Sequence, residues 1–236
     1  MRKKSVQCLT LSAPELKQQG RTLLGRALGF HDCAATTLDA LVRHGAGRTL
    51  GKGQALTRQG ELLHAMCLLV HGALEVSVTR RDGHRHMVGY IGVGDIVGII
   101  GILDGMPEMS DIYARSECAV LVVPGEAVQA LFRTDPHLGV ALAAQLARRS
   151  RFMYERLAAD PSLPIATRLM RLLNSMHRDY GPVKLSQSEL ADWVGASRQR
   201  VNFALQVLQK AGLIRVDYST IDIVDAKAFA AYLAES

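Results

Sequence analysis

Short apolar stretches separated by glycine-containing turns fill the chain from about residue 49 to 123. After the apolar run 66–70, apolar and polar positions alternate over 74–78, as expected for a strand with one buried face. Strands of about four to seven residues punctuated by glycine are typical of a small β-barrel or roll. The pattern therefore predicts a β-roll, preceded by a short helix over 36–44 that ends at Gly45.

The apolar spacing becomes helical after residue 134. Asp135-Pro136 begins a helix, because proline is tolerated in the first turn, and apolar side chains then recur every three or four residues. The predicted helix over 136–157 is roughly 33 Å long at about 1.5 Å per residue. Its stripe either packs against the core of the same chain or pairs with a second copy as a short coiled coil. For that pairing, the predicted interface residues are Leu138, Leu142, Leu146, Arg149, Met153 and Leu157.

The stretch 187–207 has the spacing of two short helices joined by a tight turn. Ser186-x-x-Glu189 is a capping box that opens the first helix. Gly195 follows where this helix must end, since glycine adopts the left-handed conformation without strain, and Ser197 caps the second helix. The inward face of the second helix has the spacing i, i+3, i+4 and i+7, with Val201, Ala204, Leu205 and Leu208. The pattern predicts a helix-turn-helix.

The outward face of this second helix is polar and basic. Arginine can bind guanine through two hydrogen bonds, and glutamine and asparagine can pair in the same way with adenine in the major groove. From Ser197 to Arg215 there are four basic residues and no acid, which favours contact with phosphates. The predicted DNA contacts are Ser197, Arg198, Gln199, Arg200, Asn202, Phe203 and Gln206. The alternative is a helical hairpin whose basic face is only solvated.

Two short strands over 214–217 and 220–224 follow, and the Tyr218-Ser219 turn between them is expected to form a wing that touches the DNA backbone. The proline-containing segment 160–164 predicts a hinge before this region. The expected fold class is α+β. Its divisions are an N-terminal extension (1–30), a β-roll domain (31–135), a dimerisation helix (136–160) and a winged helix-turn-helix (161–236).

Composition and charge are consistent with this organisation. The 236 residues are 48% hydrophobic, which is typical of a globular chain, and the net charge of +6 permits a nucleic-acid partner. No apolar run approaches the ~20 residues of a membrane helix. The basic N-terminus lacks the apolar core of a signal peptide, so we expect a cytoplasmic protein with no membrane partner.

Enzyme and metal signatures are missing from the sequence. The four cysteines lie far apart with no C-x-x-C pair, so no metal site is expected. The segment 47–52 has one residue too few for a phosphate-binding P-loop and lacks Ser or Thr after Lys52. Neither G-x-S-x-G nor H-E-x-x-H occurs. We therefore predict that the chain is not an enzyme.

Five segments together resemble the Crp/Fnr family of bacterial transcription regulators, over about residues 45 to 230. The segments are Gly60-Glu61, 69–76, 94–98, 145–149 and 195–201. The resemblance implies a domain similar to a cyclic-nucleotide-binding domain, a dimerisation helix and a recognition helix. It further implies a homodimer on a two-fold symmetric DNA operator, with RNA polymerase as a further partner. A ligand near the β-roll would then shift the chain between two dimer geometries.

The ligand positions depart from the family's cyclic-AMP-binding pattern. Ile99 follows Gly98 where such members have Glu at the ribose contact, and Glu108-Met109 falls where they place Arg-Ser on the phosphate. A shift of one residue would place Met109-Ser110 there, again without Arg. A carboxylate repels a phosphate that Arg would bind. The predicted pocket positions are Gly98, Ile99, Glu108, Met109, Met153 and Tyr154, the last two standing where the family has Thr-Ser adenine contacts.

We therefore expect that cyclic AMP is not the effector. Cyclic di-GMP, another ligand or no ligand at all remain as alternatives. Members of the family that sense through an Fe–S cluster carry a group of cysteines near the N-terminus. Cys8 and Cys33 are too few and too far apart for such a group, so we expect no Fe–S cluster. The resemblance implies no haem, because His84 and His86 fall in an expected hairpin turn. A redox role for Cys8 or Cys33 stays open, as does a nucleotide-sensing module that regulates a partner protein without binding DNA.

On the recognition helix, family members commonly carry Arg-Glu and a second Arg four residues after the Glu. Arg198 keeps the first arginine, whereas Gln199 replaces the glutamate and Phe203 replaces the second arginine. Phe203 can contact a thymine methyl group or pack against the neighbouring helix. Either way, we expect an operator preference different from that of the cyclic-AMP receptor.

Overall fold

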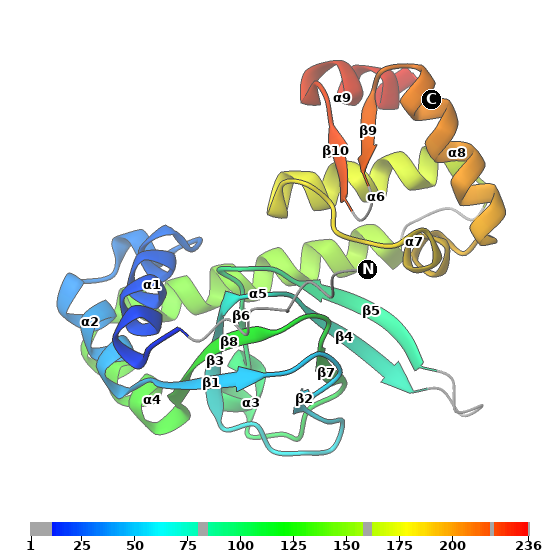
Figure 1. Ribbon diagram of the computed structural model, residues 1–236. Coiled ribbons are helices and arrows are strands. Elements are labelled where there is room, and N and C mark those ends of the chain that lie inside the picture. Colours follow the sequence, from blue (N-terminus) through cyan, green and yellow to red (C-terminus); the bar gives the residue numbers. More distant parts are fainter. Residues whose placement is uncertain (1–10, 80–84, 158–161, 218–219, 236) are drawn as a thin grey trace, which may run out of the picture. The chain divides into compact units, whose positions relative to one another are not determined.

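The chain folds as two units, residues 1–149 and 150–236, and the helix α5 (Pro136–Leu157) crosses the boundary between them. The computed structural model describes residues 11–79, 85–157, 162–217 and 220–235 (Figure 1). The predicted turn at Tyr218-Ser219 lies outside the described residues, as do His84 of the expected hairpin turn and the first part of the predicted hinge.

The first unit contains two antiparallel sheets, which confirms the predicted β-roll (Figure 1). One sheet has the order β1-β8-β3-β6 and the other β2-β7-β4-β5. The strands are β1 (Ala46–Leu50), β2 (Ala55–Thr57), β3 (Ala65–His71), β4 (Leu74–Thr79), β5 (Arg85–Ile91), β6 (Ile96–Val97), β7 (Asp111–Ala114) and β8 (Cys118–Pro124). His86, expected in a hairpin turn, lies instead in β5, where it pairs with Val78 of β4.

The unbroken apolar run of β3 is explained by burial on both of its faces. Met66, Leu68 and Val70 belong to a core beneath the helices. Cys67 and Leu69 point the other way, into a second core with residues of both sheets. Because side chains alternate along a strand, a strand buried on both sides has no polar positions in its centre.

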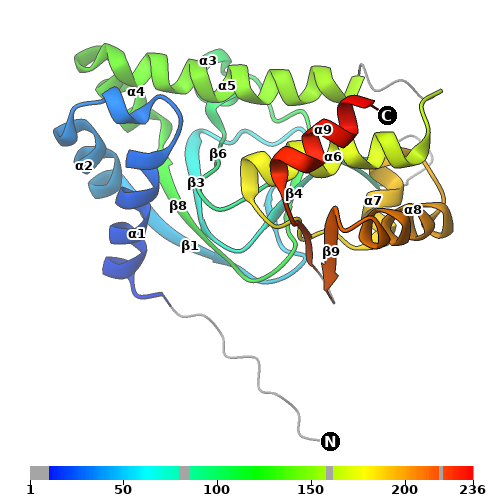
Figure 2. The ribbon, with the colours of Figure 1, turned by 90° about the horizontal axis from the view of Figure 1, so that it is seen from above.

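Helices cover the outer face of the first sheet. They are α1 (Ala13–Arg26), the short 3₁₀ helix η1 (Phe30–Asp32), α2 (Ala35–His44), α3 (Ile99–Asp104), α4 (Gly125–Thr134) and the first part of α5. Figure 2 shows α1 and α2 beside β1 and β8. The bounds of α2 and α5 confirm the two helices predicted from the sequence.

The helix α1 corrects the predicted N-terminal extension. It lies within residues 1–30 and buries Leu16 and Leu24 in the core of the first unit. The signal was present in the sequence, because Ser12 and Glu15 form a capping box of the same type as Ser186 and Glu189.

The second unit contains the predicted helix-turn-helix and strand pair. Its elements are α6 (Ile165–Tyr180), α7 (Gln187–Val194), α8 (Arg198–Lys210), β9 (Ile214–Asp217), β10 (Thr220–Ile223) and α9 (Ala226–Glu235). The helix α9 was not predicted from the sequence. Its first turn is held by Asp225, whose Oδ1 accepts hydrogen bonds from the backbone N–H groups of Lys227 (2.8 Å) and Ala228 (3.1 Å). Among the described residues, no helix is long and apolar enough to cross a membrane.

Candidate nucleic-acid interface

The first helix of the motif, α7, is fixed at both ends. At its start, the backbone N–H of Ser186 donates to Glu189 Oε2 (2.7 Å) and the N–H of Glu189 donates to Ser186 Oγ (3.3 Å). At its end, Gly195 adopts φ 63° and ψ 48°, the left-handed conformation predicted for it. Three side chains of α7, namely Leu190, Ala191 and Val194, are buried. The turn therefore sets the direction in which the second helix leaves.

The second helix, α8, turns its apolar face inward. Ser197 Oγ accepts a hydrogen bond from the backbone N–H of Arg200 (3.4 Å), as expected for a capping residue. The buried residues of α8 are Val201, Ala204, Leu205 and Leu208, as predicted. Since these occupy one side of the helix, the polar side chains lie on the other.

The predicted DNA contacts occupy this outward side with one exception. Ser197, Arg198, Gln199, Arg200, Phe203 and Gln206 are exposed. Asn202 is half-buried, and its Oδ1 accepts a hydrogen bond from Gln187 Nε2 (3.2 Å). An asparagine needs both its oxygen and its nitrogen to pair with adenine. In this structure Asn202 links α8 to α7, and it would have to give up this hydrogen bond to pair with adenine, so its DNA contact stays a prediction.

The strand pair beside α8 carries the last basic residue of the motif. Arg215 in β9 lies 3.6 Å from Asp222 of β10, and its side chain remains 70% exposed. Asp222 also lies 3.7 Å from His177 Nδ1 of α6. An exposed ion pair contributes little to stability, so the guanidinium of Arg215 can exchange this partner for a phosphate at small cost.

The end of α5 packs against the helix-turn-helix within the second unit. The rings of Phe152 and Trp193 have centroids 5.8 Å apart and planes tilted by 56°. Trp193 is half-buried, and the contact with Phe152 covers part of its ring.

The predicted ligand positions of the first unit have contrasting environments. Gly98 begins α3 with φ 81°, and a Cβ there would lie 2.0 Å from the carbonyl oxygen of Ala65, so only glycine fits. Ile99 is 3% exposed and belongs to the core beneath the helices. The prediction that Ile99 lines an open ligand pocket is therefore corrected, because its side chain supports the fold.

Glu108 and Met109 are adjacent in sequence but differ in exposure. The backbone of Glu108 pairs with the neighbouring loop, donating to Glu61 O (2.8 Å) and accepting from the N–H of Gly60 (2.8 Å). Its carboxyl is half-buried, and burial raises its pKa, against the opposing effect of Arg149. Met109 is 66% exposed. The structure thus brings Glu108 and Arg149 into one electrostatic environment and leaves Met109 on the surface.

The other two predicted pocket residues, Met153 and Tyr154, lie on the part of α5 that belongs to the second unit. They are 41% and 71% exposed.

Two motif segments that carried the family resemblance meet at an ion pair that was not predicted from the sequence. Arg148 of α5 donates to Asp95 Oδ1, and Asp95 Oδ2 accepts from the N–H of Gly92 (2.8 Å). One turn earlier on α5, Gln145 Nε2 donates to the carbonyl oxygen of Leu28 (2.8 Å). These polar contacts hold α5 against the β-roll. They explain why Asp95, Gln145 and Arg148 are polar although they lie where α5 packs.

The interface predicted on α5 is corrected for two residues. Leu138 and Leu142 are 0% and 2% exposed and pack into the core of their own unit, with Leu146 partly buried beside them. A side chain already buried in one copy has no surface left for a second copy. The side chain of Leu157 lies outside what the structure describes. Instead, α5 exposes another stripe, consisting of Val140, Ala143, Ala147, Ser150 and Tyr154.

Metal and thiol chemistry find little support in the described residues, which contain no group of three or more His, Cys, Asp or Glu side chains able to hold a metal ion. Burial raises the pKa of Cys33 to about 11 and that of Cys67 to about 12. A thiol with such a pKa stays protonated at neutral pH and reacts slowly. The redox role considered for Cys33 is therefore not favoured, while Cys8 and His84 lie outside the described residues.

The comparisons with known proteins agree with this architecture. A cyclic nucleotide-binding domain family matches residues 47–135, and a Crp-like helix-turn-helix domain family matches residues 165–232. The two matches define a regulator that combines a nucleotide-binding type of β-roll with a DNA-binding domain.

Curated relatives point to the same class. The cyclic AMP receptor protein of Thermus thermophilus is 27% identical over 84% of this chain and 92% of its own length. The cAMP-activated global transcriptional regulator CRP of Escherichia coli is 25% identical over 70% of this chain and 83% of its own length. Among solved structures, FixK2 from Bradyrhizobium japonicum has a TM-score of 0.69 at 18% identity, covering 79% of this chain and 96% of its own.

The chain belongs to the Crp/Fnr family of transcription regulators, and it carries that family's helix-turn-helix DNA-binding domain. The curated relatives include a global transcriptional regulator and a cyclic AMP receptor protein. The alternative of a nucleotide-sensing module that does not bind DNA is not favoured, because the Crp-like domain spans α6 to α9.

Proposed function

We propose that this chain is a cytoplasmic homodimer that reads a two-fold symmetric operator through α8 and acts there with RNA polymerase. The observation that carries the proposal is the exposed face of α8, where six of the seven predicted contacts are exposed, Ser197 as the N-cap of the helix and the other five on the helix itself. Two such helices reach successive major grooves when they are about 34 Å apart.

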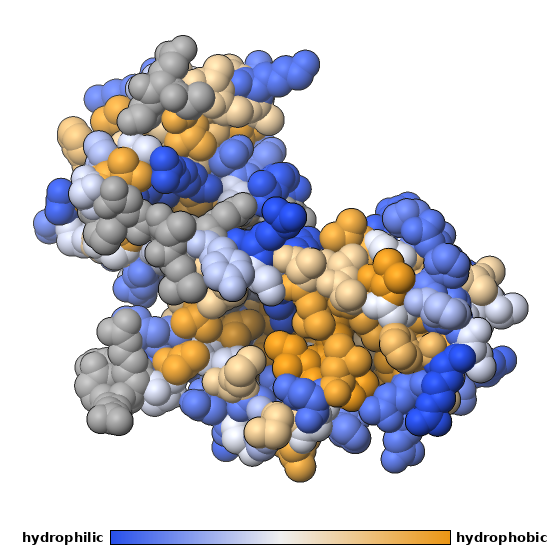
Figure 3. Space-filling model, turned by 180° about the vertical axis from the view of Figure 1, so that it is seen from behind, coloured by the Kyte–Doolittle hydropathy of each residue, from blue (hydrophilic) through white to orange (hydrophobic). Residues whose placement is uncertain are grey.

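The exposed stripe of α5 supports the dimer. Val140, Ala143, Ala147, Ser150 and Tyr154 follow one another at alternating steps of three and four residues. This is the spacing of the a and d positions of a coiled coil, and small residues there allow two helices to approach closely. Figure 3 shows hydrophobic side chains gathered on one face of the first unit, and Val140 is 62% exposed.

The proposed regulator does not respond to cyclic AMP. The half-buried carboxylate of Glu108 stands where cyclic-AMP-binding members carry Arg, and Ile99 is part of the core. Neither side chain can donate a hydrogen bond to an anionic phosphate while Glu108 is ionised.

Cyclic di-GMP or another ligand remains the candidate effector. A fold relative, the c-di-GMP responsive global regulator CLP of Xanthomonas campestris, has a TM-score of 0.62 at 22% identity, covering 81% of this chain and all of its own. The neighbouring charges of Glu108 and Arg149 would suit a ligand that offers both donor groups and phosphates.

The experiment for DNA reading is a selection of bound duplexes from a randomised pool by the purified protein. The expected result is one enriched sequence with two symmetric half-sites about 10 base pairs apart, centre to centre. A pool that stays random after repeated rounds would contradict the proposal. Calorimetric titration with cyclic di-GMP, and with cyclic AMP in parallel, tests the effector, and measurable binding of cyclic AMP at submillimolar concentration would overturn its exclusion.

A further inference from the structure

Phe203 is an exposed aromatic residue in the middle of the DNA-reading face of α8. It is 69% exposed, so its ring is not buried against a neighbouring helix, which was the second interpretation of this residue. It lies one turn after Gln199 and one turn before Gln206, on the same side of the helix. A single exposed apolar side chain is ordinary on a protein surface, so the neighbours of this ring decide whether it belongs to a contact surface.

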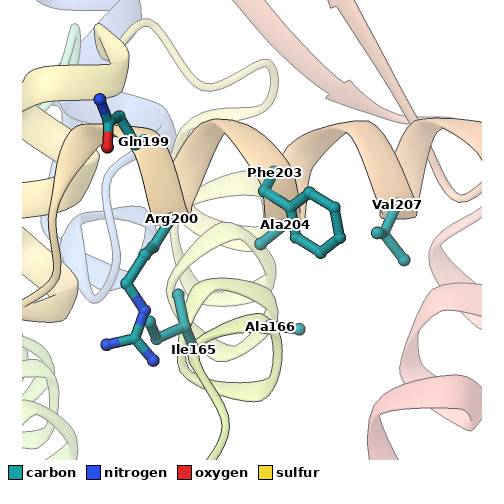
Figure 4. A pocket seen from close by; sticks show the side chains of 7 residues that line it. All are labelled: Ile165, Ala166, Gln199, Arg200, Phe203, Ala204 and Val207. Carbon is teal, nitrogen blue, oxygen red and sulfur yellow. The ribbon is translucent and has the colours of Figure 1, made fainter.

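The ring borders an apolar groove. Ile165 and Ala166 at the start of α6, together with Phe203, Ala204 and Val207 of α8, line a space of about 570 Å³. Figure 4 shows Phe203 and Val207 projecting from α8 on the side where Ile165 and Ala166 lie. Val207 is itself 42% exposed, so the apolar surface extends along α8 for one turn beyond Phe203.

One cationic side chain, that of Arg200, lines the same groove, and Arg198 and Lys210 lie elsewhere on the same helix. No acidic residue occurs from Ser197 to Arg215. The occupant must therefore combine a high negative charge with a small apolar group. In the major groove, duplex DNA meets both requirements, because thymine presents a C5-methyl group there beside the phosphate backbone.

We propose that Phe203 determines the sequence specificity of this chain by contacting the C5-methyl group of a thymine in each half-site. The inference rests on the proposed function. It assigns a preference for thymine to the base that Phe203 contacts, whereas an arginine at residue 203 would favour guanine. Gln199, one turn earlier, can read an adenine in a neighbouring base pair of the same half-site.

The test uses the duplex that the wild-type protein selects from a randomised pool. Each thymine of one half-site is replaced in turn by deoxyuridine, which removes only the methyl group, and the dissociation constant is measured by fluorescence anisotropy. Loss of one buried methyl contact corresponds to about a four-fold weakening. The expected result is this loss at one thymine, and about fifteen-fold when both symmetric positions are changed, since separated positions are roughly additive.

Three variants assign the effect to the ring. Phe203→Ala should bind the thymine and deoxyuridine duplexes equally, whereas Phe203→Leu should keep part of the discrimination. Val224→Ala is the matched control, since Val224 is 61% exposed in the same unit but lies outside α8. This control should discriminate like the wild type. Circular dichroism checks that each variant is folded.

The outcomes separate the inference from the proposed function. If the wild-type protein selects no sequence, both fail. If it selects a symmetric operator but tolerates deoxyuridine at every thymine, only the role of Phe203 fails. That role also fails, with the proposed function intact, if Phe203→Ala discriminates between the two duplexes as strongly as the wild type.

Discussion

Two surfaces of this chain differ in charge, namely the outward face of α8 and the predicted ligand positions of the β-roll. The outward face of α8 carries arginine, glutamine and a capping serine, all exposed, in a segment with no acid from Ser197 to Arg215. The predicted ligand positions of the β-roll include Ile99, which lies in the core, and Glu108, whose half-buried carboxyl has a pKa raised by burial. We expect the first surface to bind a polyanion, and we expect the second to lack the arginine contact that cyclic-AMP-binding members of the family provide.

The difference teaches that each unit has to be assessed by its own side chains, because the fold of a domain does not fix what it binds. The helix-turn-helix keeps its caps, its glycine turn and its exposed basic face. In the β-roll unit, Arg148 of α5 contacts Asp95, and Ile99 of the predicted ligand positions lies in the core.

The largest expected effect is on the stability of the β-roll unit, through a core side chain of α5. Leu138→Ala should lower the free energy of unfolding by about 2–5 kcal/mol, because it leaves a cavity in a core where this side chain is fully buried. His137→Ala on the same helix should cost less stability, because the side chain of His137 is exposed and is not part of the proposed dimer stripe. Urea denaturation compares the two variants. Similar losses for both would show that the two faces of α5 are not distinct.

The next effect tests the surface that attracts DNA. Arg198→Ala should weaken binding to the selected duplex by about 1–3 kcal/mol if the side chain reads a base. Arg171→Ala, which removes an exposed arginine of α6 in the same unit, is the matched control and should leave sequence preference intact. Anisotropy titrations on selected and scrambled duplexes measure both. An unchanged affinity for Arg198→Ala would remove this residue from the reading face.

A smaller effect tests how α5 is attached at its start. Asp135 Oδ2 accepts hydrogen bonds from Thr37 Oγ1 (2.6 Å) and the N–H of Ala34 (3.0 Å), and the bond from Thr37 is the main cause of its lowered pKa. Asp135→Ala should cost about 1–2 kcal/mol at neutral pH, as for loss of a helix cap. Asp39→Ala, on the exposed surface of α2, should cost less.

The pH dependence of this attachment has a definite sign. Because the pKa of Asp135 is lower in the folded state, the carboxylate stabilises the protein above its unfolded pKa of about 3.9. That contribution is lost as the pH falls through the folded pKa. The difference between wild type and Asp135→Ala should therefore shrink on acidification, and a constant difference down to pH values below the folded pKa would argue against the role of the charge.

The smallest effect concerns Glu108, at the predicted ligand positions of the β-roll. Burial raises the pKa of Glu108, so its ionised form is less favourable in the folded state than in the unfolded chain. The folded protein should therefore lose stability as the pH rises through this pKa, and Glu108→Gln should not show that loss. Melting temperatures of the two proteins should agree in acid and separate at neutral pH, with the variant higher. The opposite order at neutral pH would show that Glu108 is stabilised by its charge.

The sequence was sufficient where structure depends on neighbours along the chain. The caps at Ser186 and Ser197, the turn at Gly195 and the buried face of α8 follow from local spacing, and the structure confirms them. The helix α1 had an equally local signal in its capping box, although it was not predicted. The exposed positions on α8 followed from the same periodicity.

The sequence was insufficient where distant segments meet. The contact of Arg148 with Asp95 joins residues 53 positions apart, and the hydrogen bond from Gln187 to Asn202 joins two helices. The helix α5 has two stripes at similar spacing, and only the position of its own core shows which stripe is covered. Packing against the rest of the fold, and not helical periodicity, decides such cases.

The central claim is that this chain reads DNA without cyclic AMP. The most direct test is a titration of the purified, nucleotide-free protein on its selected duplex and on a scrambled duplex, each with and without millimolar cyclic AMP. We predict tight, sequence-specific binding without the nucleotide and an unchanged dissociation constant in its presence. Sequence-specific binding that arises only when cyclic AMP is added would contradict the account.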